Sequence, residues 1–492
     1  MAKRSKTSEA GRATRFDGPS ITRATGNGLS QRSDGTKLAS VVADRIIDDI
    51  AAAGWPVGIV VGSEPELLER HGVSRAVFRE AVRLLEHLQV ARMRRGPGGG
   101  LVVMPATADS VIDAVSVYLF YVGATIEEVA FARRAVEETA VELAAARIDE
   151  SGIEALRALV AAEGEGAERD HRALHNLVAQ LSGNPALAFF VDLLNRVMLL
   201  YYPATRGGVG KDTLTASAHA HARIAEAVLS GDPGLARARM RRHLEAEAEY
   251  MRAKRASLRR LADLPAATNR SEKRAEQVAT QIFGEVARDG WRVGSLLGSE
   301  AELMERYDVS RAVLREAVRV LEHHQVARMR RGPGGGLFVT EPGVQAVTEA
   351  LALQIDRLGI ERSHLFEVRT ALENVVLDLV LDHLDDDGIA TLQAALEAER
   401  AATTEEFVYL GHDLHGVLAT VAGNRVLELL TLVLVRLSRL RSAAPPGAPP
   451  TLPTDEVMHV HRRIVEAIIA GDRDLARHRM RRHLDALVTW TR

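Results

Sequence analysis

The clearest hydrophobic pattern along the chain is amphipathic and covers residues 74–88. At 100° per residue, one arc of this segment is apolar and consists of Val77, Phe78, Ala81, Val82, Leu85 and Leu88. The opposite arc carries Ser74, Arg75, Arg79 and Arg83. Ser74 is suited to cap the first turn of a helix. The pattern therefore predicts a helix that packs one face on a core and presents Arg75 and Arg79 from its first turns.

Segments on both sides of this helix complete a small motif. Residues 63–66, Ser-Glu-Pro-Glu, form a capping box that predicts a short preceding helix, and Gly72 is suited to the tight turn between the two helices. Residues 90–95 predict a strand, the glycine-rich residues 96–100 a turn, and residues 101–104 a returning strand. The sequence therefore predicts a helix, a turn, a second helix and a β-hairpin wing with arginines at its base.

The same pattern returns 236 positions later, in residues 310–337. The two copies differ at only three places: Phe78/Leu314, Leu84/Val320 and Leu88/His324. A solvated surface would explain the arginines of one copy, but their identity in both copies favours contact with DNA. The candidate DNA-contacting residues of the first copy are Ser74, Arg75, Arg79, Arg83, Arg94, Arg95, Gly98 and Gly99. Those of the second copy are Ser310, Arg311, Arg315, Arg319, Arg330, Arg331, Gly334 and Gly335.

Both copies contain the segments GSE, VSR, REAVR and RRGPGGGL in the same order and at the same spacing. This combination of cap, turn, arginine-bearing helix and glycine-rich wing resembles the winged helix-turn-helix domain of the GntR family of bacterial transcription regulators. The family's usual Leu-Pro-Ser-Glu appears here as Val-Gly-Ser-Glu and Leu-Gly-Ser-Glu. The resemblance implies double-stranded DNA as a partner, with one helix of each copy in the major groove.

After each wing the composition changes to Ala, Leu, Glu and Arg at helical spacing, which predicts an all-helical bundle. We expect a disordered basic tail at 1–36, winged domains at 37–105 and 273–342, helical domains at 106–254 and 343–492, and a polar linker at 255–272. The predicted fold class is mainly α. It is an internal duplication, in which a winged helix-turn-helix domain precedes a helical bundle twice.

The two predicted bundles share a sparse set of residues in the same order. It comprises Leu174-His175 and Leu414-His415, Gly183-Asn184 and Gly423-Asn424, two His-x-His segments and two Arg-His segments. This order resembles the FCD effector domain of the FadR-type branch of the GntR family. The resemblance implies a divalent metal between the helices, and imidazole ligands suit zinc. The implied ligands are His171, His175, His221 and His243 in the first bundle and His415, His461 and His483 in the second.

The two implied metal sites differ at one position. The family's metal-binding aspartate falls on His171 in the first bundle and on Gly411 in the second. The first site could therefore offer four nitrogen ligands, whereas the second needs a water or an effector carboxylate to complete its shell. We expect the first site to bind metal more tightly and the second to respond to an effector. A histidine in a helical core is more often a packing residue than a ligand, so that alternative stays open.

Arg134 and Glu138 match Arg369 and Glu373 in the order of shared residues. Arg134 and Arg369 are the candidate effector-binding residues, because an arginine can hold a carboxylate through two hydrogen bonds. Ion pairs with Glu138 and Glu373, one helical turn further on, would explain both arginines equally well.

The composition narrows the class of protein. A chain of 492 residues with 46% hydrophobic and 26% charged residues is typical of several folded domains. The net charge of -3 means that a DNA-binding surface must be a local basic patch. The absence of cysteine excludes thiolate zinc sites and fits a cytoplasmic location. The most apolar stretch, 186–204, is interrupted by Asp192 and Arg196, so we expect a buried helix and no membrane partner.

These observations predict a ligand-responsive DNA-binding transcription regulator, acting as a repressor and controlled by a small carboxylate or acyl effector. Because one chain carries two winged domains, we expect an intramolecular pseudo-twofold pair on a nearly palindromic operator, with a homodimer of chains left open. The main alternative is an architectural DNA-binding protein without an effector, and a metalloenzyme is the lesser one. The sequence contains no H-E-x-x-H arrangement, Ser/His/Asp set or phosphate loop, so we expect no enzymatic activity.

Overall fold

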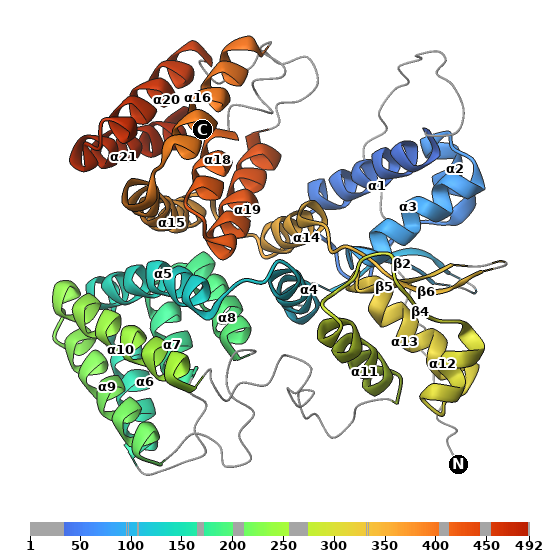
Figure 1. The fold of residues 1–492 in the computed structure, drawn as a ribbon, viewed down its shortest axis with the longest axis horizontal. Helices are drawn as coiled ribbons and strands as arrows, with labels where there is room; N and C mark the ends of the chain where they lie inside the picture. The colour runs from blue at the N-terminus through green and yellow to red at the C-terminus, as the bar shows by residue number, and fades with distance from the viewer. Residues whose placement is uncertain are drawn as a thin grey trace, which may run out of the picture. The chain divides into compact units, whose positions relative to one another are not determined.

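A computed structural model describes residues 34–492 except for 95, 97, 106–107, 165–171, 200–210, 255–273, 331, 333, 403–412, 443–453 and 491–492 (Figure 1). The chain divides into two compact units, Met1–Ala108 and Asp109–Arg492. The predicted linker at 255–272 and nearly all of the predicted tail at 1–36 lie outside the described residues. Helix α1 begins at Asp34, inside the predicted tail, so the folded region starts slightly earlier than the composition indicates.

The first unit is a winged helix-turn-helix domain. Its elements are α1 (Asp34–Ala52), β1 (Val60–Gly62), α2 (Glu64–His71), α3 (Arg75–His87), β2 (Ala91–Arg94) and β3 (Gly100–Val103). The three strands form an antiparallel sheet in the order β1-β3-β2, with Arg92 opposite Val102. The sequence does not predict β1, because three residues are too few to establish an alternating pattern.

The predicted motif of the first unit is confirmed. Ser63 and Glu66 form the capping box, since the Ser63 amide donates to the Glu66 carboxylate at 2.9 Å and the Ser63 hydroxyl accepts from the Glu66 amide. Gly72 ends α2 at φ 63°, a left-handed conformation that favours glycine and turns the chain into α3. Phe78 is 1% exposed, so the apolar face of α3 packs into the core as the pattern predicts.

The second winged domain has the same order of elements. These are α11 (Arg274–Arg288), β4 (Leu296–Gly298), α12 (Glu300–Arg306), α13 (Arg311–His323), β5 (Ala327–Arg330) and β6 (Gly336–Val339), and the sheet order is β4-β6-β5. Helix α4 (Ala108–Tyr121), which follows the first wing in sequence, packs against this second domain. The rings of Phe120 and Tyr121 lie 6.1 and 5.5 Å from that of Trp291, and the Tyr121 hydroxyl donates to Glu341 at 3.2 Å.

The remaining helices form two bundles. The first contains α5 (Ile126–Arg147), α6 (Glu150–Gly164), α7 (Ala173–Leu181), α8 (Pro185–Leu199), α9 (Lys211–Leu229) and α10 (Pro233–Lys254). The second contains α14 (Val344–Arg357), α15 (Arg362–His383), α16 (Asp386–Ala401), α18 (Asp413–Val421), α19 (Arg425–Ser442), α20 (Thr454–Ile469) and α21 (Arg473–Trp490). The predicted fold class, mainly α with two winged domains and two helical bundles, is confirmed.

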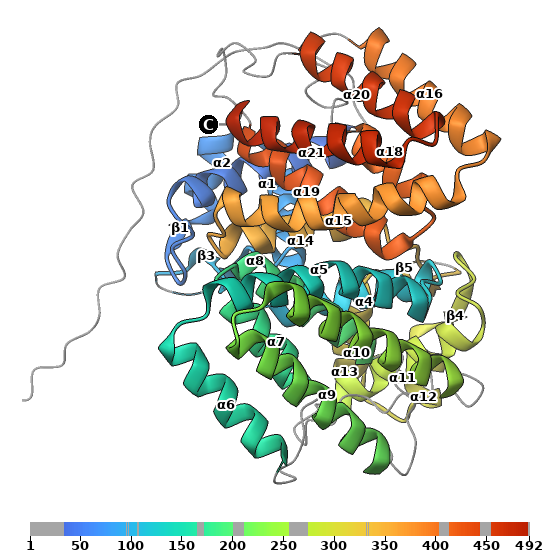
Figure 2. The same cartoon turned by 90° about the vertical axis from the view of Figure 1, so that its left-hand side faces the viewer.

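The two bundles contact each other through equivalent residues, and α5 lies beside α15 (Figure 2). The side-chain amide of Asn184 donates to the His364 carbonyl at 2.9 Å, near the start of α15. The side-chain amide of Asn424 donates to the Glu128 carbonyl at 3.3 Å, near the start of α5. Each bundle therefore donates a hydrogen bond from the same asparagine, and each accepts one at the same helix start. This is the pattern of an isologous interface within one chain.

Candidate functional site

The two helices that bear the predicted arginines, α3 and α13, are here called the reading helices. Each begins at a serine whose hydroxyl accepts from the backbone amide three residues further on, Ser74 from Val77 and Ser310 from Val313, both at 3.4 Å. This cap fixes where the helix begins, and it leaves the following arginines on the first turns.

The predicted arginines of the reading helices lie at the surface. The side chains of Arg83 and Arg319 are each 75% exposed and pair with a glutamate one turn back, at 2.8 and 2.9 Å. Arg311 and Arg315 are each 65% exposed and share the carboxylate of Glu300 at 3.5 and 3.1 Å. Ion pairs this exposed contribute little to stability, so a phosphate or a base edge can replace the carboxylate at low cost.

The two wings hold their arginines differently. Arg94 donates to the Gly98 carbonyl at 3.0 Å, whereas the Arg330 guanidinium lies over the Phe338 ring at 4.4 Å. Gly98 and Gly334 adopt φ 71° and 72°, which favours glycine. The predicted residues Gly99 and Gly335 close the turns, since their amides donate to Gly96 and Gly332 at 2.8 Å. Arg95 and Arg331 lie outside the described residues.

Three histidines from three helices meet in the first bundle and form the first histidine cluster: His175 on α7, His221 on α9 and His243 on α10. The Nε2 atom of His243 lies 3.3 Å from Nε2 of His221 and 3.3 Å from Nε2 of His175. The cluster is buried and lines a cavity of about 690 Å³ together with Ser217 and Glu247.

The second bundle repeats this arrangement. The second histidine cluster consists of His415 on α18, His461 on α20 and His483 on α21. Nε2 of His483 lies 3.1 Å from Nε2 of His415 and 3.2 Å from Nε2 of His461. The structure thus brings together six of the seven histidines that the sequence proposes. His171, and Gly411 at the matching position, lie outside the described residues.

In each cluster, two of the three histidines are each oriented by a glutamate carboxylate. Glu137 accepts from Nδ1 of His175, and Glu373 accepts from Nδ1 of His415 at 2.5 Å. On the next helix, Glu163 accepts from Nδ1 of His221 at 3.0 Å, and Glu399 accepts from Nδ1 of His461 at 2.9 Å. Because each carboxylate binds the proton on Nδ1, the lone pair on Nε2 is left to face the centre of the cluster.

The surroundings of the first cluster favour a neutral His243 and an ionised Glu137. Burial raises the pKa of the Glu137 carboxyl, but Arg133 and His175 outweigh it and bring the pKa down to about 2. Burial, with His175 and His221 nearby, lowers the pKa of His243 to about 3. In the second bundle burial again raises the pKa of Glu373, and His415 and Arg369 lower it to about 2.

The donor set fits a divalent cation. With both Nδ1 protons bound to carboxylates, the Nε2 lone pairs of His175 and His221 both face Nε2 of His243, which has at most one N–H to offer them. In a tetrahedral zinc site with bonds of about 2.0–2.1 Å, the nitrogen atoms lie roughly 3.3 Å apart. Two of the three separations in each cluster, 3.1–3.3 Å, match that spacing, and all three donor atoms of each cluster lie within 4.8 Å of one another. These six histidines could therefore hold a metal in each bundle.

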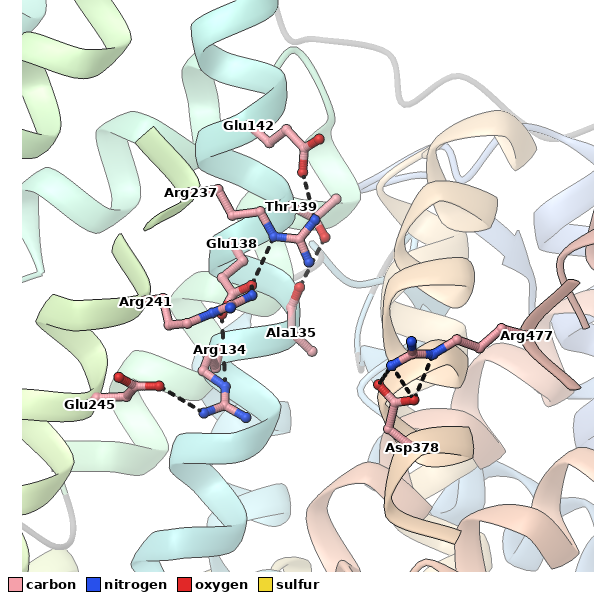
Figure 3. A network of polar contacts seen from close by, with 10 residues as sticks. All are labelled: Arg134, Ala135, Glu138, Thr139, Glu142, Arg237, Arg241, Glu245, Asp378 and Arg477. Carbon is pink, nitrogen blue, oxygen red and sulfur yellow. Dashed lines mark hydrogen bonds and ion pairs between the residues drawn. The ribbon is translucent and has the colours of Figure 1, made fainter. Parts of the chain in front are cut away.

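The structure corrects the pairing of Arg134 with Arg369. The buried counterpart of Arg369 is Arg133, which donates to Glu137 at 2.8 Å just as Arg369 donates to Glu373 at 2.5 Å. Arg134 lies one residue round the helix, with its side chain 32% exposed, in a surface network with Glu138 and Glu245 (Figure 3). It does not line the cavity beside the first histidine cluster.

The sequence does not predict that four glutamates orient the histidines, although it offers Glu373 as an ion-pair partner of Arg369. The signal was available, because the winged domains repeat at a spacing of 236 residues and the same spacing pairs Glu137 with Glu373 and Glu163 with Glu399. The histidines repeat at 240 instead. The change of spacing falls between α6 and α7, so an alignment anchored on the histidines loses the glutamates.

Within the described residues, every helix falls short of the length and apolar character that a membrane crossing requires.

Comparisons with known families agree with this architecture. The FCD domain family matches residues 128–246 and again 364–486, which are the two bundles. The family described as bacterial regulatory proteins, gntR family, matches residues 274–339, the second winged domain.

Individual relatives correspond to about half of the chain. The HTH-type transcriptional regulator YcbG of Bacillus subtilis is 28% identical over 225 residues, covering 46% of this chain and 92% of that protein. The HTH-type transcriptional repressor NanR of Salmonella newport is 27% identical over 235 residues, covering 44% of this chain and 86% of that protein. A solved structure, Streptococcus agalactiae GntR, is 25% identical in sequence, with a TM-score of 0.33. The match covers 43% of this chain and 96% of that chain.

Proposed function

We propose that this chain, a DNA-binding transcription regulator of the GntR family with FCD domains, places two winged domains on one nearly palindromic operator and responds to an effector through its helical bundles. The observation that carries the proposal is the pairing, within one chain, of two matching reading helices with two matching buried histidine clusters. We assign it the role of a repressor, the role that the name of the relative NanR carries, acting in the cytoplasm where the chromosome lies.

The pairing of the two halves within one chain supports an intramolecular pseudodimer that arose by tandem duplication. Relatives of the length of YcbG cover about 46% of the chain, so two such lengths stand in sequence here. The reciprocal contacts of Asn184 and Asn424 give the bundles a pseudo-twofold relation, which suits two half-sites of inverted sequence. We propose that the domain boundaries follow this division, with readers at 37–105 and 273–342 and bundles at 106–254 and 343–492.

A divalent metal, with zinc the best chemical match, is proposed for each histidine cluster. When bound, such an ion supplies a positive charge that can take a carboxylate oxygen of an effector. The chain's own residues prepare the site, since Glu137 and Glu163 fix the orientation of His175 and His221 before anything binds. Burial excludes water and strengthens these contacts.

Helix α4 provides a physical route from the first bundle to the second winged domain. It precedes α5 in sequence, yet Phe120 packs on Phe283 and Trp291 of the second domain, with ring separations of 5.8 and 6.1 Å. A shift at the N-terminal end of α5 would therefore move α4 against that domain. This supports a response in which an effector in one bundle changes how the readers sit on DNA.

The proposal is tested by measuring operator binding in the presence and absence of chelator and carboxylate. We expect a change in operator affinity of fivefold or more on adding an effector carboxylate to metal-loaded protein, the lower end of typical allosteric coupling. His221→Ala with His461→Ala should bind DNA but lose that response, and His459→Gln, on the exposed face of α20, should keep it. Operator affinity that ignores both metal and every carboxylate tried would favour an architectural protein instead.

A further inference from the structure

The β-hairpins of the two wings have matching backbones. Both turns are closed by a backbone hydrogen bond of 2.8 Å, and the strands of both hairpins pair in the same register. Arg94 lies opposite Gly100 on the returning strand, and Arg330 lies opposite Gly336. A difference in how the two arginines are held must therefore come from the side chains around them.

The positions opposite the two arginines have no room for a side chain. A Cβ at Gly100 would lie 2.5 Å from a carbonyl oxygen of β1, and a Cβ at Gly336 would lie 2.6 Å from one of β4. The next position on the same face of the returning strand is the diagonal one, two residues further on, which a long side chain can reach. It is occupied by Val102 in the first wing and by Phe338 in the second.

The diagonal residue decides where each guanidinium lies. The Phe338 ring is only partly buried, and the Arg330 guanidinium lies 4.4 Å from its centroid, where the ring attracts a cation. Val102, which is 8% exposed, has no ring to offer, and Arg94 donates instead to the Gly98 carbonyl at 3.0 Å. Gly98 belongs to the turn at the tip of the wing, whereas Phe338 lies in the strand behind it. The two guanidinium groups therefore point in opposite directions along their hairpins.

We propose that the chain lies on its operator in one preferred orientation, because only the first wing inserts its arginine, Arg94, into the minor groove. Phe338 is a positioning residue that holds Arg330 back over the sheet. A narrow A·T-rich minor groove has a strongly negative potential that attracts arginine. The half-site under the first winged domain should therefore carry A·T pairs where the wing meets it. This inference rests on the proposed function and adds a direction to it, since reading helices with the same arginines cannot distinguish two matching half-sites.

Selection of bound sites from random DNA with the full-length protein tests the role of Phe338. In wild type we expect A·T pairs at the minor-groove positions of one half-site in each selected sequence. Phe338→Leu, which keeps an apolar side chain without a ring, should show them at both half-sites, and Val102→Phe at neither. The double exchange should restore them at one half-site. Phe338→Tyr keeps the ring and should select as wild type.

A single label on the first winged domain measures the orientation itself. The chain contains no cysteine, so Glu69→Cys provides one attachment point on the exposed face of α2, the first helix of the helix-turn-helix, which crosses the DNA backbone in such complexes. An iron chelate attached there cleaves the DNA beside it. On an operator with A·T pairs at one half-site only, the wild-type background should cleave that half about two- to fivefold more often. In the double exchange the preference should move to the other half.

Three results would overturn the inference while leaving operator binding by two winged domains intact. They are equal A·T enrichment at both half-sites in wild type, a selection that Phe338→Leu leaves unchanged, and equal cleavage of the two halves. If Val102→Phe fails to fold, Phe338→Leu alone decides between these outcomes. Selection of a single half-site per chain would overturn the proposed function and this inference together.

Discussion

The two reading helices are almost identical in sequence, whereas the two bundles share only a sparse set of residues. Residues 74–101 and 310–337 differ at three positions, none of them on the basic face. The bundles keep the histidine clusters and their glutamates, but Glu247 and Ser217 of the first are Leu487 and Val457 in the second. Under the proposed function, this difference means that the two winged domains read nearly the same sequence, whereas the two histidine clusters can differ in the ligand that they accept.

The largest expected effect is a loss of operator affinity when the arginine of one reading helix is removed. Arg75→Ala and Arg311→Ala should each cost about 1–3 kcal/mol of operator binding if the arginine reads a guanine edge, and the double variant roughly the sum. The measurement is a gel-shift titration at fixed salt. Arg400→Ala, an exposed arginine of the second bundle with a 79% exposed side chain, serves as the control and should bind as wild type. A double variant with normal affinity would remove the reading helices from the DNA contact.

The next effect concerns the glutamate that orients a histidine in both bundles, and it is a loss of stability and of metal affinity. Glu373→Gln leaves the buried Arg369 and His415 without a carboxylate partner, which should destabilise the protein by about 3–5 kcal/mol. Glu137→Gln should cost less, because Arg133 keeps its contact with Glu247. Either change should weaken metal binding by about 10–100-fold. Thermal melts and elemental analysis after mild chelation measure the two losses. Glu142→Gln, whose side chain is 45% exposed, is the matched control, and an equal loss there would refute a special role for the buried glutamates.

A pH dependence follows from the same groups. Burial lowers the pKa of His415 from 6.5 to about 4; the Glu373 carboxylate raises it and the Arg369 charge lowers it further. The pKa of Glu373 falls from 4.5 to about 2. The unfolded chain takes up the histidine proton first, so metal-free protein should lose roughly 3 kcal/mol from this group as the pH falls from 6.5 to 4. The glutamate contribution is present above pH 4.5 and is lost towards pH 2.

Urea unfolding of chelated protein at several pH values measures this loss. His415→Asn should flatten the fall between pH 6.5 and 4, whereas His459→Gln, an exposed histidine, should not. A wild-type stability that is level between pH 7 and 4 would contradict the buried neutral histidine.

The smallest expected effect is a loss of stability that tests whether the two bundles contact each other symmetrically. Asn184→Ala and Asn424→Ala each remove one hydrogen bond to a helix start in the opposite bundle and the cap that the same side chain gives its own helix. Each should cost about 1–2 kcal/mol. Because the two sets of contacts match except for a further hydrogen bond from Asn184 to Glu367, the losses in chemical unfolding should be similar, with Asn184→Ala slightly the larger. A large loss for one variant and none for the other would show that the bundles are not related by a pseudo-twofold axis.

The sequence predicts local structure well where side-chain pattern and caps coincide. Ser74 and Ser310 mark helix starts, and the arginines of α3 and α13 lie on the exposed face, because capping and amphipathicity are local properties. Six histidines meet as the resemblance implies. Arg133 escapes prediction because Arg133 and Arg134 are adjacent, and only packing decides which of them turns inward. The contact of α4 with Trp291 is likewise invisible in sequence, because it joins segments far apart in the chain.

The central claim, one chain reading one operator with two matched winged domains, is tested most directly by selecting bound sequences from random DNA with the full-length protein. The mass of the selected complex is then measured. We predict two inverted half-sites of nearly the same sequence and one chain per operator, because the exposed arginines of α3 recur on α13. Two unrelated half-sites, or a single half-site bound by one chain, would contradict the account.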